Sequence, residues 1–332
     1  MSLFVLGLRR SGTTILYDAL REDPELACFY EPLREQEPTI GGGSGARDED
    51  AFAETRARRD AFMADRYPDL QAELFNWGGP RAPELELEPE LPEFVSEFLV
   101  YLLDSAPDVA IKETRLHHKL GEVARIAPDA TVVHLVRDPR AVTASMLLGR
   151  RRRTDIYPDA DTFFTARTGR RLWSSRRIAD DLLARYATLE LPADVPDFLR
   201  PLLVWRAAFA STNRDGERLF GGRYALVRLE DLRVDPALEL GRIYGLLGRP
   251  VPASVTAWAK EHVRDDPRLH LGDDPRWAQG ARAVGMEREL ERAGYGEILE
   301  LAATDGPELD LTPPPARSRL SGFIGRARGR RP

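Results

Sequence analysis

The stretch LFVLGLRRSGTTILYDALREDP, residues 3–24, decides the fold of this chain. Its first four residues form a short apolar run, which is typical of a buried strand. A loop bounded by Gly7 and Gly12 follows, and apolar residues then recur at helical spacing from Thr13 to Leu20. A strand, a tight glycine loop and a helix point several backbone N–H groups and a helix N-terminus at one place. Such a place attracts phosphate.

The loop has nearly the spacing of a nucleotide-binding P-loop and departs from it at one position. P-loop kinases and NTPases carry a lysine after the second glycine, where it reaches the outer phosphates of ATP. That position is Thr13 here, with Thr14 after it, and the positive charge comes earlier, at Arg9 and Arg10. The loop therefore predicts a phosphorylated nucleotide other than Mg-ATP.

The run Arg10-Ser11-Gly12-Thr13-Thr14 after a strand resembles the 5′-phosphosulfate loop of sulfotransferases that use 3′-phosphoadenosine 5′-phosphosulfate (PAPS). The resemblance is nearest to the tyrosylprotein, carbohydrate and bacterial sulfotransferases. It implies that these five residues, with Arg9 before them, bind the 5′ end of the nucleotide. It also implies a catalytic role for Arg10. The alternative is a turn and a capped helix that bind no ligand.

A second candidate phosphate site follows the clearest strand in the sequence, Thr131 to Val136. This strand is apolar on both faces, as a central parallel strand should be. The next residues begin a helix, with Asp138 as a natural N-cap and Pro139 as a natural first helical residue. Arg137 at the strand end and Ser145 about two turns into the helix can hold one phosphate. In residue types and spacing they match the 3′-phosphate site of the sulfotransferases.

Glu31 and Lys112 each lie at the end of another short predicted strand. In α/β proteins with parallel sheets, ligands sit beyond the carboxyl ends of the strands. The resemblance implies that Glu31 is the general base that takes a proton from the acceptor. It also implies that Lys112 neutralises a sulfonate oxygen.

His117 and His118 follow Lys112 closely, and one of them stays open as the base or as a contact to the acceptor. Adjacent histidines project about 100° apart on a helix, so they form a poor metal pair. No cluster in the sequence requires a metal. Glu230 lies in a Leu-Glu-Asp-Leu run that resembles a structural element of the family, and Trp277 is expected to approach the nucleotide.

The composition is that of an ordinary soluble globular protein, with 42% hydrophobic and 31% charged residues. No apolar run approaches the roughly 20 residues of a membrane helix, and the first eight residues are too short for a signal peptide. A single cysteine, Cys28, excludes an internal disulfide framework. These features predict a cytoplasmic location. A net charge of −6 argues against general nucleic-acid binding.

The predicted fold is a three-layer α/β/α sandwich around a four- or five-stranded parallel sheet, of the P-loop-like sulfotransferase type. One domain is expected over residues 1–310. Within it, an insert of helices and loops at about residues 35–105 is expected to form the acceptor pocket. The tail, residues 311–332, is rich in arginine and is expected to be disordered. A weak contact of this tail with an anionic membrane surface stays open, as does the oligomeric state.

The predicted function is transfer of a sulfuryl group from PAPS to a hydroxyl of a small molecule, a glycan, a lipid or a peptide, without a metal. One alternative is a P-loop-like kinase of a small molecule, which Thr13 in the lysine position opposes. A further alternative is a nucleotide-binding module without catalytic activity.

Overall fold

The computed structural model describes residues 1–33, 46–69, 83–149, 156–168, 175–185, 189, 191, 194–264, 271–303, 307–309 and 311. Within them lies one five-stranded sheet whose neighbouring strands are all parallel, in the order β2-β3-β1-β4-β5. The strands are β1 Ser2–Leu6, β2 Ala27–Tyr30, β3 Val109–Glu113, β4 Thr131–Val136 and β5 Tyr224–Arg228. The prediction of an α/β fold with a four- to five-stranded parallel sheet is confirmed.

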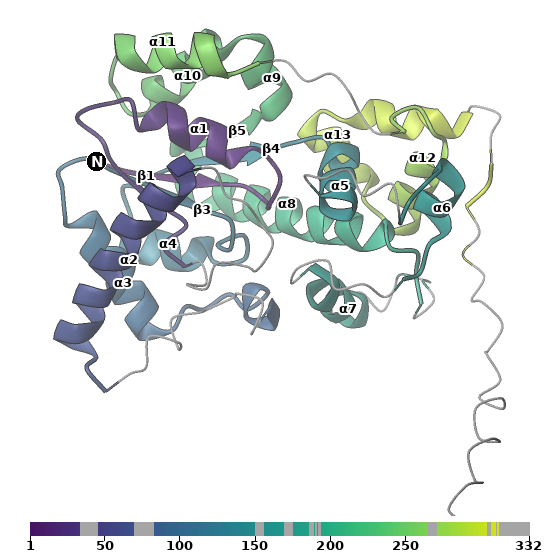
Figure 1. The fold of residues 1–332 in the computed structure, drawn as a ribbon, viewed down its shortest axis with the longest axis horizontal. Coiled ribbons are helices and arrows are strands. Elements are labelled where there is room, and N and C mark those ends of the chain that lie inside the picture. The colour runs from purple at the N-terminus through teal and green to yellow at the C-terminus, as the bar shows by residue number, and fades with distance from the viewer. Residues whose placement is uncertain are drawn as a thin grey trace, which may run out of the picture.

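Helices occupy most of the remaining described chain (Figure 1). The α-helices are α1 Thr13–Leu20, α2 Ala46–Arg66, α3 Glu93–Leu103, α4 Leu120–Ile126, α5 Pro139–Leu148, α6 Ala160–Thr165, α7 Ser175–Arg185, α8 Leu199–Phe220, α9 Leu229–Val234, α10 Pro236–Leu246, α11 Ala253–His262, α12 Arg276–Ala283 and α13 Glu287–Ala293. Short 3₁₀ helices are η2 Pro83–Glu86, η3 Gly221–Arg223 and η4 Gly296–Ala303.

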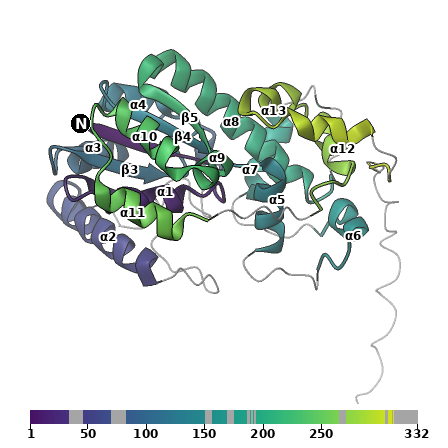
Figure 2. The same ribbon diagram turned by 90° about the horizontal axis from the view of Figure 1, so that it is seen from above.

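The sheet is covered on both faces because β1 is apolar on both faces. Leu3 and Val5 pack with α1, α10 and α11, whereas Phe4 and Leu6 pack with α3, α4 and α8. The two sets of helices lie on opposite sides of the strands in Figures 1 and 2. This arrangement gives the three predicted layers and leaves the strand ends as the place where loops can hold a ligand.

A further group of helices, α5 to α8 with α12 and α13, packs around its own apolar cluster beside the sheet (Figure 2). Trp277 on α12 lies in this cluster, with its ring centroid 5.1 Å from that of Phe164 and 5.8 Å from that of Phe198. Its indole N–H donates to the carbonyl of Leu271 at 2.7 Å. Trp277 is 1% exposed and belongs to the core, so the expectation that it approaches a nucleotide is not met.

The region expected to be an insert contains α2, η2 and α3 between β2 and β3. Its residues 83–86 form the 3₁₀ turn η2. Residues 34–45 and 70–82 lie outside the described residues, as does the arginine-rich tail apart from residue 311. The single domain over residues 1–310 stays a prediction.

Candidate active site

The loop between β1 and α1 is a tight turn in which the N–H of Ser11 donates to the carbonyl of Leu8 at 2.9 Å. Gly12 is the N-cap of α1, with φ 87°, and provides no side-chain cap for the helix. A Cβ at this position would lie 2.6 Å from the Leu229 side chain. Only glycine therefore fits, both for its left-handed backbone and for the space.

Arg10 joins the two predicted phosphate sites. Its backbone has φ 76°, an uncommon conformation for a residue with a side chain. Its Nε donates to the hydroxyl of Ser145 on α5 at 2.7 Å. A guanidinium nitrogen of Arg137 donates to the carbonyl of Arg10 at 3.2 Å. The loop after β1 and the start of α5 after β4 are therefore in direct contact at one rim of the sheet.

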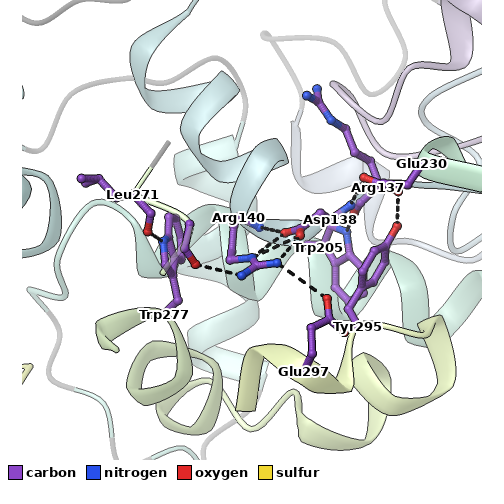
Figure 3. A network of polar contacts seen from close by, with 10 residues as sticks. Arg137, Asp138, Arg140, Trp205, Glu230, Leu271, Trp277, Tyr295 and Glu297 are labelled. Carbon is purple, nitrogen blue, oxygen red and sulfur yellow. Dashed lines mark hydrogen bonds and ion pairs between the residues drawn. The ribbon is translucent and has the colours of Figure 1, made fainter. Parts of the chain in front are cut away.

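Arg137 is held through its backbone by α8 and α9, as Figure 3 shows. The indole N–H of Trp205 donates to the carbonyl of Arg137 at 3.0 Å. The next N–H, that of Asp138, donates to one carboxylate oxygen of Glu230 at 3.1 Å, and the hydroxyl of Tyr295 donates to the other at 2.7 Å. In Figure 3 the guanidinium of Arg137 extends away from this network. The network thus fixes the backbone and leaves the guanidinium turned toward the loop after β1.

The start of α5 is capped as predicted. The side chain of Asp138 accepts a hydrogen bond from the N–H of Arg140 at 2.8 Å, and Pro139 is the first helical residue. Arg140 also pairs with the Asp138 carboxylate through its own guanidinium, and it donates to the carbonyl of Gly272 at 2.8 Å (Figure 3). Because Asp138 is engaged twice, the turn that carries Arg137 is rigid.

Glu31 and Lys112 meet at the ends of β2 and β3. The N–H of Glu31 donates to the carbonyl of Lys112 at 2.7 Å, and the Lys112 ammonium contacts the Glu31 carboxylate. The ammonium also lies 4.1 Å from the ring centroid of Tyr30. Burial disfavours the charged form of Lys112, but the charges of Glu31 and Tyr30 outweigh it and raise the pKa of the lysine. Glu31 itself has φ 40°, which marks a constrained position.

The remaining loop residues have partners within the protein. Thr13 and Ser11 are buried. The hydroxyl of Thr14 lies 3.0 Å from that of Tyr30, next to Lys112. Arg9, expected to bind the nucleotide, is only 8% exposed, and its guanidinium pairs with the carboxylate of Glu86. Burial lowers the pKa of Arg9, whereas Glu86 and other nearby carboxylates outweigh it, so the pKa is raised.

His117 contacts α8, and no described hydrogen bond joins it or His118 to Glu31. Nδ1 of His117 lies 3.2 Å from the hydroxyl of Thr212 on α8. Burial, with nearby cations and histidines, holds the pKa of His117 well below its usual range. Burial also lowers the pKa of His118 to about 4. Both are therefore neutral and weakly basic at neutral pH.

The sequence analysis predicted no role at the site for three residues that lie near it: Glu86, Glu113 and Lys119. Glu113 is fully buried and accepts from the N–H groups of Leu33 and Thr114 at 2.9 and 2.7 Å. Burial raises its pKa. Glu86 lies in a stretch rich in proline and glutamate. The alternation of Leu85, Glu86 and Leu87 there was the available signal of a half-buried segment.

Comparison with known proteins identifies the part of the chain that carries this site. Residues 2–154 match the model of a sulfotransferase family. Over these residues the chain is similar to the sulfotransferase family. They include both candidate phosphate sites, Glu31 and Lys112. The three-layer P-loop-like fold predicted from the resemblance agrees with the sheet and its flanking helices.

Carbohydrate sulfotransferase 1 of Homo sapiens is 29% identical to this chain over 165 residues, which are 48% of this chain and 34% of that relative. The carbohydrate sulfotransferase 1 of Rattus norvegicus is 28% identical over the same shares. The match thus spans about a third of the length of these relatives. They are Golgi-resident enzymes, and this finding makes the predicted cytoplasmic location wrong.

Solved structures of sulfotransferases are similar to this chain at low identity. Sulfotransferase STF9 of Mycobacterium avium is 16% identical with a TM-score of 0.47, over 93% of this chain and 78% of that one. Sulfotransferase STF1 of Mycobacterium tuberculosis is 17% identical with a TM-score of 0.43, over 88% and 76%.

Two absences concern the part of the chain that the structure describes. None of its helices is both long and apolar enough to cross a membrane. No group of three or more His, Cys, Asp or Glu side chains there has the arrangement of a metal site.

Proposed function

We propose that this protein transfers a sulfuryl group from PAPS to a hydroxyl group of an acceptor. The observation that supports the proposal is the contact of Arg10 with Ser145 and Arg137, because it joins the two loops that were predicted to bind phosphate. A nucleotide with phosphates at both its 5′ and 3′ positions needs two anion sites on one rim of the sheet. A sugar hydroxyl is the first acceptor to test, because the curated relatives are named carbohydrate sulfotransferases.

In the proposed reaction the bond from sulfur to the bridging oxygen of the 5′-phosphate breaks, and a bond from sulfur to the acceptor oxygen forms. Negative charge collects on the departing phosphate oxygen. Arg10 and the N–H groups of residues 12–14 are suited to stabilise it, because a fixed cation and backbone dipoles need no rearrangement. Most of the rate enhancement should come from positioning and charge, as in phosphoryl transfer.

We propose Glu31 as the general base that removes the acceptor proton, with Lys112 orienting its carboxylate and then facing the sulfonate. Their direct contact supports this pairing. His117 is a weaker candidate, because it is a neutral imidazole of low pKa on the side of α8. A positioned base contributes on the order of 10²- to 10⁴-fold in rate.

The binding test is a calorimetric titration with adenosine 3′,5′-bisphosphate and, separately, with ATP and Mg²⁺. Binding of the bisphosphate alone supports the proposal. Preference for ATP with Mg²⁺ would instead support a kinase.

The activity test supplies radiolabelled PAPS with a panel of sugars and other hydroxyl compounds. Replacement Glu31→Gln should lower turnover by roughly 10²-fold or more while the affinity for bisphosphate stays within about threefold. Loss of activity in His117→Gln with Glu31→Gln fully active would reassign the base. Binding without transfer to any acceptor would leave a non-catalytic module.

A further inference from the structure

Residues 83–88, here called the strap, are tied to the loop after β1 by buried charges. Apolar and charged side chains alternate along the strap. Leu87 belongs to the apolar cluster that includes Leu8 on that loop, and Leu85 packs against the cluster under the sheet. Glu86 and Glu88 carry charge between them. The strap therefore packs against two apolar clusters and lies next to the loop after β1.

The side chain of Glu86 forms the first attachment. Both of its carboxylate oxygens accept from the guanidinium of Arg9, in a pair whose side chains are 8% and 7% exposed. Arg115 adds a second cation, with its Nε 3.8 Å from a Glu86 oxygen. A charge buried this deeply is strongly destabilising without its partner, so the pair holds the strap in one place.

Lys119 forms the second attachment through the backbone of the strap. Its ammonium donates to the carbonyls of Leu85, Glu86 and Glu88 at 2.8, 2.9 and 2.5 Å. Three acceptors match the three N–H groups of an ammonium. The strap is thus fixed by its side chain to the loop after β1 and by its backbone to the chain that follows β3.

Further charged residues connect Glu86 of the strap with Glu31, the candidate base. Arg115, which faces Glu86, also pairs with the buried Glu113, with its NH1 3.6 Å from the carboxylate. Against the effect of burial, the charges of Glu31 and Glu113 both raise the pKa of Lys112, whose ammonium contacts Glu31. The strap, the nucleotide loop and the base therefore share one charged cluster.

We infer that the strap couples the nucleotide loop to the acceptor side of the site, with Glu86 as a positioning residue that acts through Arg9. Arg9 already holds Glu86 and the strap against the loop after β1, so phosphates that bind and stiffen this loop should also reduce the local opening of the strap. This inference rests on the proposed function, in which that loop binds the nucleotide and Glu31 faces the acceptor.

The test is amide hydrogen exchange of the full chain with and without adenosine 3′,5′-bisphosphate. In the wild type, the nucleotide should slow exchange in residues 7–14 and also, by roughly fivefold or more, in residues 83–88. Glu86→Gln should keep the first effect and lose the second. Glu88→Gln is the matched control, because its carboxylate pairs with Arg185 at a site where both side chains are nearly half exposed. It should behave as the wild type.

The outcomes separate the two proposals. Slower exchange in residues 7–14 alone in the wild type overturns the coupling and leaves the proposed function standing. Unchanged exchange in both segments overturns both. If Glu86→Gln does not fold, the wild-type comparison still decides, and Lys119→Met serves as the second variant. A strap that is still slowed by nucleotide in a folded Glu86→Gln protein would reduce the Arg9–Glu86 pair to a structural role.

Discussion

At Arg10 a left-handed backbone, a hydrogen bond to Ser145 and an acceptor for Arg137 are combined in one residue. The backbone conformation turns its carbonyl toward Arg137, while its side chain reaches α5. A guanidinium carries five N–H donors in one planar fork, and the bond to Ser145 is made by the Nε–H. An arginine can in this way bond α5 and a phosphate at the same time.

This geometry predicts that lysine cannot replace Arg10. Lysine has one nitrogen and cannot bond Ser145 and a phosphate in the same fork. We expect Arg10→Lys to lower turnover by roughly 10²- to 10³-fold, measured as sulfuryl transfer at saturating PAPS. Arg125→Lys, an exposed arginine paired with Glu122, is the control and should retain full turnover. Wild-type turnover in Arg10→Lys would remove the residue from the mechanism.

Two glycines allow a test of the loop conformation. Gly12→Ala places a Cβ on a backbone of φ 87° and against Leu229, so we expect a loss of roughly 2 kcal/mol or more in the free energy of unfolding. Gly121→Ala on α4 meets no atom within 4 Å and should stabilise the protein by about 0.5–1 kcal/mol. Urea denaturation measures both. Equal effects of the two substitutions would contradict the described loop.

At the scale of elements, the turn from β4 to α5 depends on helices that are distant in sequence. Trp205 of α8, Glu230 of α9 and Tyr295 after α13 all fix the backbone at Arg137 and Asp138. None of them offers a charge to the ligand in this arrangement. They hold the backbone of Arg137 in place, and the position of its Cα limits where the guanidinium can reach.

Removal of one hydroxyl tests this support. Tyr295→Phe leaves one Glu230 oxygen without its donor, and we expect a loss of about 1–2 kcal/mol in stability with a weaker preference for nucleotides that carry a 3′-phosphate. The measurement is the ratio of affinities for adenosine 3′,5′-bisphosphate and adenosine 5′-monophosphate. Tyr244→Phe removes a comparable buried hydrogen bond, to Asp23 at 3.0 Å, and should not change the ratio. A similar fall of the affinity ratio in both variants would mean that the ratio responds only to a general loss of stability.

Much of the fold and part of the site followed from local patterns. β1, β4 and the capped start of α5 were predictable because glycines, an Asp-Pro pair and apolar runs act over a few residues. The contact of Arg10 with Ser145 was not predictable, because it depends on how β1 and β4 pair in space. The strap was missed because its proline and glutamate content is typical of disordered chain, and its partners Arg9 and Lys119 lie far away in sequence.

Across the whole molecule, two buried histidines, His117 and His134, and the partly buried His118 should make the folded state sensitive to acid. Burial lowers the pKa of His134, in the middle of β4, to about 3, and that of His118 to about 4. The pKa of His117 is also well below its usual value. Between the usual pKa near 6.5 and these low values, the unfolded chain binds protons that the folded chain does not. Stability is therefore full above about pH 6.5 and falls as the pH is lowered.

The size of this effect can be measured in His134→Gln. Each histidine contributes a slope of about 1.4 kcal/mol per pH unit where only the unfolded chain is protonated. Denaturation between pH 7.5 and 4.5 should show a smaller slope in His134→Gln than in the wild type. His262→Gln, at an exposed residue stacked on Trp258, should leave the slope unchanged. An unaltered slope in His134→Gln would show that His134 is not buried as a neutral group.

The strands β1 and β4 are neighbours in the sheet, with Leu6 opposite His134. This pairing bears on how the acceptor preference of the protein could be altered. Main-chain hydrogen bonds set the distance between these strands, at about 4.8 Å in any sheet. The sheet would therefore fix the spacing of the two proposed phosphate sites at the ends of β1 and β4. The helices α2 and α3, between β2 and β3, lie outside this pair of strands. Engineering a new acceptor preference should therefore exchange these two helices and keep Glu86 between them, because its loss would leave the buried Arg9 beside β1 without its carboxylate.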